Sequence, residues 1–407
     1  MSGPGPTSRI PGFHQMDAET RAQRVAIFAR LDDEEKALLA AGRRPDDTAH
    51  PFSVFDKMVE NVVGSVGLPL GIATNFVIDG QDRLIPMAVE EPSVVAAASN
   101  AAKMARASGG FDTKSEQTWM TGQVHLLDVP DAARAAERIG AHREEILAAA
   151  EPPGSSIGKM GGGSKDLEVR VLHTDALRSS EAKEALGHAV VVVHLFVDVR
   201  DAMGANAVNT RVERIAPLLE ELSGGRVRLR ILSNLADRRI VTARGTFDAE
   251  ALGGPEVVQG ILEAQWLAEL DPYRAATHNK GVMNGVDAVV VATGNDWRAT
   301  EAGAHAYAAR DGSYSPLTRY HRNADGDLVG ELSLPLALGT VGGATRVNPM
   351  ARLSLKILGV DSAEALGRIA CAVGLAQNLA ALRALATEGI QKGHIRLHDR
   401  LADRAAH

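Results

Sequence analysis

The sequence contains a single cysteine, Cys371, so an internal disulfide framework is excluded. This fits a reducing cytoplasm, and we expect Cys371 to be a small buried apolar residue because no second cysteine stands near it. The N-terminal stretch lacks the apolar core of a signal peptide, and no apolar run is expected to span a bilayer. These absences predict a cytoplasmic protein with no membrane partner.

The sequence also has no net positive charge. The net charge is −7, which excludes a global basic field for binding nucleic acid or a membrane surface. A local basic pocket for an anionic small molecule is still compatible with this balance. Hydrophobic residues make up 45% and charged residues 23%, as in ordinary globular proteins, and a length of 407 residues favours two domains or one interrupted domain.

The middle of the chain, residues 120–233, has a self-contained pattern. Strand-like and helix-like segments follow in the order βαββαβ, which is typical of a ferredoxin-like unit. The predicted strands are 123–129, 166–174, 188–199 and 226–233, and the predicted helices are 131–151 and 202–222. A Gly- and Ser-rich loop at 152–165 is expected to be mobile.

The flanking segments, 1–119 and 234–407, predict one larger, helix-rich α/β domain that the middle unit interrupts. Apolar periodicity predicts helices at 18–31, 33–42, 91–108, 255–270 and 362–390. A β-branched run, GVDAVVVAT at 285–293, predicts a buried strand, and GTVGGATRVNP at 339–349 predicts a glycine-rich turn.

The segment DAMGAN at 201–206 follows a predicted strand and opens a predicted helix. Free N–H groups at a helix start attract phosphate, and Gly204 would let the backbone approach a ligand closely. The plainer interpretation makes Asp201 an ordinary helix N-cap. The spacing is not GxGxxG, so a Rossmann fingerprint is excluded.

A second group of polar residues lies further along the chain. Lys280 and Asn284 share one face if their segment is helical, and Asp296 follows the predicted strand at 285–293. A lysine and an aspartate there could polarise a carbonyl or form a structural ion pair. Glu91 and His394 also have plain interpretations, as a charge against a helix dipole and as an exposed histidine.

Together these segments resemble one family. EEPSVVAAAS, DAMGAN, HNKGVMNGVDAVVVATGNDWRA, GTVGGATRVNP and GIQKGHIRLH are similar to motifs of hydroxymethylglutaryl-CoA reductase, and ENVVGSVGLPLGIATNF is similar to that family's ENVIG segment. The resemblance runs from about residue 9 to about residue 400, in the family's order. Lacking a membrane segment, the chain resembles the soluble bacterial class, class II.

The resemblance implies a two-hydride interconversion of hydroxymethylglutaryl-CoA with mevalonate and coenzyme A, by way of mevaldehyde. It implies that Lys280 stabilises the developing oxyanion and that Glu91 donates a proton to the forming alcohol. His394, on a C-terminal flap from about residue 385, would protonate the leaving thiolate. Asp296 would tune Glu91 and Lys280 through its charge.

The same resemblance implies the binding positions. Those for substrate are Ser93, Arg274, Thr277, Asn284 and Asn378, with Arg274 expected to hold the substrate carboxylate in a bidentate fork. Those for the dinucleotide are Asp201, Met203, Gly204 and Asn206 in the inserted domain, and Thr340, Gly342 and Gly343 near the nicotinamide. Arg9, in SRIPGF, is expected to meet a coenzyme A phosphate, and no metal ion is expected.

Cofactor preference and assembly are less specified. NAD-preferring relatives can carry an acidic residue where this chain has Gly154; Glu151 stands close by, but Ser155, Ser156 and Lys159 could accept a phosphate. NAD and NADP both stay open, with a slight lean to NAD. The resemblance implies an active site between subunits, with Glu60 and Asn61 of the ENVVG segment at the interface, and hence a homodimer or larger homo-oligomer.

Two other function classes compete with this interpretation. A catalytically silent sensor of nucleotide or coenzyme A has no chemical need for Glu91, Lys280, Asp296 and His394 together. An ordinary hydroxy-acid dehydrogenase performs one hydride step and expels no thiolate. Release of free thiol from the thioester separates both alternatives from a reductase.

Overall fold

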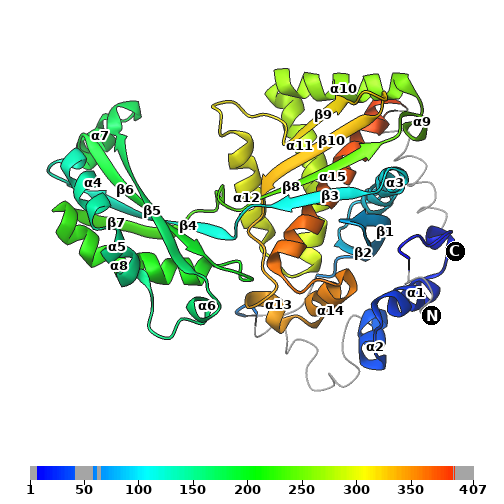
Figure 1. Cartoon of the computed structure of the whole chain (residues 1–407), viewed down its shortest axis with the longest axis horizontal. Coiled ribbons are helices and arrows are strands. Elements are labelled where there is room, and N and C mark those ends of the chain that lie inside the picture. Colours follow the sequence, from blue (N-terminus) through cyan, green and yellow to red (C-terminus); the bar gives the residue numbers. More distant parts are fainter. Residues whose placement is uncertain (1–6, 42–57, 62–65, 388, 390–407) are drawn as a thin grey trace. The chain divides into compact units, whose positions relative to one another are not determined.

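The computed structural model describes residues 7–41, 58–61, 66–387 and 389 (Figure 1). The chain divides into two compact units, one formed by Met1–Ser115 with Val241–His407 and the other by Glu116–Ile240. The sequence predicted an inserted segment from residue 120 to 233. Helices and strands are interspersed along the chain, and the strands form two sheets, so the predicted mixed α/β class is confirmed.

The unit Glu116–Ile240 is built on a four-stranded antiparallel sheet. Its strands lie in the order β5 (Gly163–His173), β6 (Ala189–Asp198), β4 (Trp119–Leu127) and β7 (Arg226–Leu232). The helices are α4 (Ala132–Ala141), α5 (Arg143–Ala150), α6 (Ser156–Lys159), α7 (Ser180–Leu186) and α8 (Ala205–Ser223), with a 3-10 turn η3 (Thr174–Ala176). This strand order matches the predicted ferredoxin-like unit.

Three local predictions for this unit were wrong. The helix predicted at 131–151 is broken at His142 into α4 and α5, and the loop at 152–165 contains α6 and the start of β5. Helix α8 begins after Gly204 rather than after Asp201, so Asp201 is not its N-cap. Gly204 has a φ of 102°, and a Cβ there would lie 2.5 Å from Val199 Cγ1, so glycine is required by backbone and packing together.

The other unit contains a six-stranded mixed sheet. Its strands lie in the order β2 (Gln81–Ala88), β1 (Leu70–Ile78), β3 (Phe111–Ser115), β8 (Ile240–Phe247), β10 (Leu328–Pro335) and β9 (Thr318–Arg322). Around it lie η1 (Phe13–Gln15), α1 (Ala18–Ala29), α2 (Asp33–Ala41), α3 (Val94–Ala107), α9 (Ala249–Leu252), α10 (Pro255–Leu270), α11 (Pro272–Ala292), α12 (Trp297–Ala308), α13 (Gly343–Val347), α14 (Pro349–Leu358) and α15 (Ala363–Ala386).

The predicted strand at 285–293 was also wrong, because this segment is the second half of α11. Its valines favour a strand by intrinsic propensity. Helix α11, however, packs against α10, α15 and β2, which buries most of its surface and removes the polar stripe that marks a half-exposed helix. Tertiary burial therefore overrides the local preference, and Asp296 follows a helix instead of a strand.

Helix α15 carries Cys371, which is fully buried as predicted. By length and composition α15 could cross a bilayer, contrary to the sequence expectation, but 67% of its most apolar window is buried inside the protein. It packs against α3, α10, α11 and the sheet strands β3 and β10. Its apolar character is thus accounted for by its place in the core.

Candidate active site

An ion pair in the larger unit joins α11 to the segment before α3. Lys280 Nζ lies 2.6 Å from Glu91 Oε2, and Asn284 Nδ2 lies 3.5 Å from the same oxygen. Lys280 and Asn284 are one helical turn apart, as the sequence predicted. The side chains of Lys280 and Glu91 are 58% and 33% exposed, so a cation and a carboxylate meet where a small molecule can reach them.

Ser93 stands beside this pair in a strained conformation. It is the N-cap of α3 with a φ of 78°, a left-handed value that a residue other than glycine adopts at a cost of about 1 kcal/mol or more. Its hydroxyl makes no capping bond. In this left-handed conformation Ser93 does not have the backbone geometry of an ordinary N-cap, so its hydroxyl is available to another partner.

Arg274 lies in the first turns of α11, and its guanidinium is unusual. Its Nη1 and Nη2 atoms are shielded from solvent and have no hydrogen-bond partner among the described residues. Burial lowers the pKa of Arg274. Burial, and then the neighbouring Arg274 charge, lowers the pKa of His278 to about 3. An unpaired guanidinium costs free energy unless an anion completes it, so Arg274 is suited to bind one.

Two predicted site residues are placed differently from expectation. Asp296 caps α12 by accepting from Ala299 N at 3.0 Å, and it pairs with Arg298 at 3.8 Å. Within the described part of the chain, no hydrogen bond or ion pair joins it to Lys280 or Glu91. Its expected tuning contact with that pair is therefore absent from this conformation.

Asn378 is the second of these residues. It is 1% exposed on α15, and it accepts from Tyr320 Oη at 2.9 Å and donates to His278 O at 3.0 Å. Both ends of its amide are used inside the core, where Asn378 supports α11, and its contact with substrate stays a prediction. Thr277, by contrast, is exposed on α11.

The second glycine-rich turn lies beside the start of α12. Asn295 accepts from Gly339 N at 2.7 Å and donates to Gly339 O at 3.1 Å, which fixes the turn to the α11–α12 connection. Gly342 and Gly343 follow with φ values of 81° and 52°. Thr340 Oγ1 is buried and has no partner in the described ranges, which leaves a polar atom for a ligand.

In the unit Glu116–Ile240, the predicted dinucleotide residues surround the start of α8. Gly204 is buried, Asp201 and Met203 are half-buried, and Asn206 is exposed. Sequence reasoning missed Arg239, which donates to Ala202 O at 3.1 Å beneath this turn. Burial lowers the pKa of Arg239 to about 10, opposed by Asp198 and Asp201. The charge near Ala202 could not be foreseen because Arg239 lies far along the chain.

The loop that follows α5 is held by a second buried arginine. Arg211 on α8 is 2% exposed and donates to Glu151 Oε2 at 2.7 Å and to Oε1 at 3.2 Å. Ser155 Oγ also accepts from Arg211, at 3.1 Å. The carboxylate of Glu151 is therefore engaged inside the protein, and the loop is tied to α8 instead of standing free.

The larger unit also contains a cavity of about 920 Å³ between its N-terminal segment, β1 and α3. Arg9, His14, Arg21 and Lys103 contribute basic groups to its lining. Arg9 was predicted from the sequence, whereas Arg21 and Lys103 were missed because they lie on separate helices. The cavity offers several cations to an anionic ligand.

For three other predicted residues, His394, Glu60 and Asn61, the described part of the structure gives no contact with the site. His394 and most of the expected flap lie outside the described residues. Glu60 and Asn61 are described and exposed, and Asn61 has a φ of 57°.

Comparisons with known proteins bear on this arrangement. The model of the hydroxymethylglutaryl-coenzyme A reductase family matches residues 20–399. A 3-hydroxy-3-methylglutaryl-coenzyme A reductase from Archaeoglobus fulgidus is 53% identical over 97% of this chain and 86% of its own length. A probable enzyme of the same name from Borreliella burgdorferi is 36% identical over 84% of this chain and 76% of its own length.

Solved structures agree with these sequence matches. The class II 3-hydroxy-3-methylglutaryl-CoA reductase from Streptococcus pneumoniae, bound to NADPH in open conformations, is similar with a TM-score of 0.85 and 40% identity, covering 93% of this chain and 99% of its own. A second structure of that enzyme has a TM-score of 0.86 over 95% of this chain and 90% of its own. The chain belongs to the hydroxymethylglutaryl-CoA reductase family.

Proposed function

We propose that this chain interconverts hydroxymethylglutaryl-CoA with mevalonate and coenzyme A through mevaldehyde, with a nicotinamide dinucleotide as redox partner. The observation that carries the proposal is the contact of Lys280 with Glu91 at 2.6 Å. The helix of Lys280 also bears Arg274, whose Nη atoms have no partner in the described residues. Membership of the family supplies the reaction, and this geometry supplies groups that suit it.

The dinucleotide supplies or accepts a hydride at each of the two steps. Each reductive step leaves negative charge on an oxygen, and Lys280 Nζ is a cation that can face that oxygen. Glu91 is hydrogen-bonded to the same ammonium and can pass a proton to the alkoxide that forms from mevaldehyde. Asn284, 3.5 Å from Glu91 Oε2, orients the pair.

The first step also expels coenzyme A as a thiolate, which takes up one proton. We keep His394 as the proposed donor, on the basis of the family motif alone. Asp296 stays proposed as a catalytic residue on the same basis, although it caps α12 in this conformation.

The two ends of the substrate find separate partners. Arg274 is proposed to take the substrate carboxylate, since its Nη atoms lack any partner in the described chain. Ser93 is proposed to help, because its strained conformation leaves its hydroxyl uncapped. The cavity lined by Arg9, Arg21 and Lys103 is proposed for the phosphates of coenzyme A.

The dinucleotide is proposed to bind at the start of α8, where the helix begins without a side-chain cap and its N–H groups can meet a phosphate. Thr340, Gly342 and Gly343 are proposed for its nicotinamide end. The lean to NAD stays a proposal that Glu151 does not support, because Arg211 already engages its carboxylate. The Streptococcus pneumoniae relative was solved with NADPH bound, so NADP stays the alternative cofactor in this proposal.

We further propose a homodimer, or a larger assembly of dimers, in which Glu60 and Asn61 contribute to the shared interface. Both residues are exposed in the single chain, as an interface before assembly would be. Sedimentation at several protein concentrations tests this, and a chain that stays monomeric while fully active would contradict it.

The reaction is tested with purified protein, hydroxymethylglutaryl-CoA and either NADH or NADPH, following dinucleotide oxidation and thiol release together. We expect two dinucleotides oxidised for each thiol released. Oxidation without thiol release would indicate an ordinary dehydrogenase, and binding without oxidation would indicate a sensor.

A further inference from the structure

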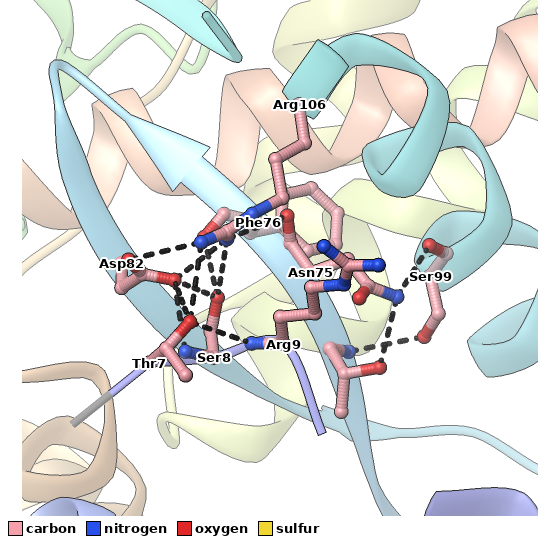
Figure 2. Close-up of polar contacts among 9 residues, drawn as sticks. Thr7, Ser8, Arg9, Asn75, Phe76, Asp82, Ser99 and Arg106 are labelled. Carbon is pink, nitrogen blue, oxygen red and sulfur yellow. Dashed lines mark hydrogen bonds and ion pairs between the residues drawn. The ribbon is translucent and has the colours of Figure 1, made fainter. Parts of the chain in front are cut away.

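The N-terminal segment is fastened to the sheet through a buried serine. Ser8 is fully buried, and its N atom donates to Asp82 Oδ1 at 2.8 Å. Ser8 Oγ lies 2.5 Å from Asp82 Oδ1 and 2.9 Å from Phe76 O. Asp82 stands on β2, more than seventy residues along the chain, so these bonds join distant segments (Figure 2).

Arg106 on α3 completes the contact. Its Nη1 lies 2.6 Å from Asp82 Oδ1, its Nη2 donates to Asp82 Oδ2 at 3.3 Å, and Nη2 also donates to Thr7 Oγ1 at 3.1 Å. Burial tends to raise the pKa of Asp82, but the bonds from Arg106 and Ser8 outweigh it and lower that pKa. The carboxylate is therefore charged across the neutral range. We call Ser8, Asp82 and Arg106 the N-terminal clasp.

A bulge in β1 prepares the place where this segment pairs. The register with β2 shifts between Ala73 and Phe76, and Asn75 has a φ of 71°. The bulge turns Asn75 N toward the segment, where it donates to Ser8 O at 3.1 Å. Asn75 Nδ2 donates in turn to Ser99 O at 3.2 Å, which fixes the bulge to α3 (Figure 2).

The clasp ends where the cavity begins. Arg9 follows Ser8 directly and lines the cavity of about 920 Å³, as do the next residues through His14. The lining also includes Thr74, Asn75 and Ser99, which belong to the bulge and its α3 partner. Asp82 is not part of the lining, so it can influence a ligand there only by holding Arg9 and the bulge in place.

We propose that Asp82 is a positioning residue for the nucleotide part of coenzyme A: the clasp fixes where Arg9 enters the cavity. This inference rests on the proposed function, because it assumes that coenzyme A occupies this cavity. Asp82 touches neither Lys280 nor Glu91, so its role concerns affinity for the coenzyme A moiety and not hydride chemistry.

The test replaces the carboxylate by an amide in Asp82→Asn and measures three quantities. These are KM and kcat with hydroxymethylglutaryl-CoA, KM and kcat with mevaldehyde, which carries no coenzyme A, and the Kd of coenzyme A by calorimetry. We expect KM for the thioester and Kd of coenzyme A to rise about 5- to 20-fold, since charge-assisted bonds are lost. Both constants for mevaldehyde should stay within about 2-fold.

Asp79→Asn is the matched control. Asp79 lies in the same β1–β2 hairpin and accepts from Thr113 N at 2.8 Å, but it forms no hydrogen bond or ion pair with the N-terminal segment from Thr7 onward. We expect this variant to leave all three quantities unchanged. If Asp82→Asn does not fold, Ser8→Ala removes one arm of the clasp while the Asp82–Arg106 pair stays, and a smaller rise in the Kd of coenzyme A is then expected.

Two results would overturn the inference. One is an unchanged Kd of coenzyme A in a folded Asp82→Asn protein, and the other is an equal loss with mevaldehyde, which would make the clasp merely structural. A failure of the proposed function looks different, because the unmodified chain itself would then release no thiol from hydroxymethylglutaryl-CoA.

Discussion

Two shielded arginines, one in each unit, are bonded in opposite ways. Arg211 on α8 is almost completely buried, and Glu151 and Ser155 accept its hydrogen bonds. Arg274 on α11 has two shielded Nη atoms without a partner among the described residues. A satisfied cation stabilises a fold, whereas an unsatisfied one is maintained only if something outside the chain completes it. The contrast separates a structural arginine from the arginine that we propose to bind the substrate carboxylate.

The largest effect should come from Lys280, the exposed cation on the same helix as Arg274. Lys280→Ala should lower kcat for both the thioester and mevaldehyde by about 1,000-fold, because both steps build charge on an oxygen. Initial rates with each substrate measure this. Lys356→Ala is the control, because Lys356 on α14 forms an ion pair with Glu35 on α2 at 2.6 Å and forms no hydrogen bond or ion pair with Glu91 in the described chain. A variant that kept mevaldehyde reduction would refute a shared cation.

Arg274→Met sharpens the comparison most directly. We expect kcat/KM to fall about 100-fold for both substrates, because both carry the carboxylate. The free energy of unfolding should stay the same or rise, because a poorly satisfied charge is replaced by an apolar chain. Denaturant unfolding and rate assays on one preparation measure both. A clear loss of stability would show that Arg274 is structural after all.

Glu151→Gln should have the opposite signature. Removing the carboxylate leaves Arg211 buried without its charged partner, so the free energy of unfolding should fall by about 2 kcal/mol. Glu144→Gln is the control, because the exposed pair of Glu144 with Arg143 is screened by solvent and its loss should leave the free energy of unfolding nearly unchanged. Equal effects of the two substitutions would contradict the structural role of Arg211.

These predictions also show what sequence reasoning can reach. The spacing of Lys280 and Asn284 on one helix face follows from a short local pattern, whereas the start of α8 after Gly204 does not. The extent of α11 did not, because its valines are held in a helix by packing on several sides. The burial of Asn378 depends on partners that folding brings from distant segments, whereas the cap that Asp296 makes to Ala299 N is a local pattern that the wrong strand prediction at 285–293 concealed.

The smallest effect concerns a group of partly buried titratable side chains on α11 and α12, namely Asp287, Glu301 and His305. Burial and then Glu301 raise the pKa of Asp287 on α11, and Glu301 raises the pKa of His305, which bonds Tyr314 Oη at 2.7 Å. The pKa values of Asp287 and His305 are both higher in the folded state than in the unfolded state. These two groups therefore contribute stability at low pH that is lost as the pH rises through their folded pKa values.

Asp287→Asn should therefore flatten this loss. Comparing unfolding free energies of the variant and the unmodified chain between pH 6 and pH 9 should show a difference of about 1 kcal/mol that grows with pH. Measuring the difference cancels the titration of other groups, including His278. A difference that shrinks with rising pH would contradict the assigned directions.

The most direct test of the account is a crystal structure of the protein with mevalonate and coenzyme A bound. The account predicts that the mevalonate carboxylate accepts hydrogen bonds from Arg274 Nη1 and Nη2, while the terminal hydroxyl of mevalonate contacts Lys280 Nζ. A bound mevalonate whose carboxylate lies elsewhere, with Arg274 still unpaired, would contradict it.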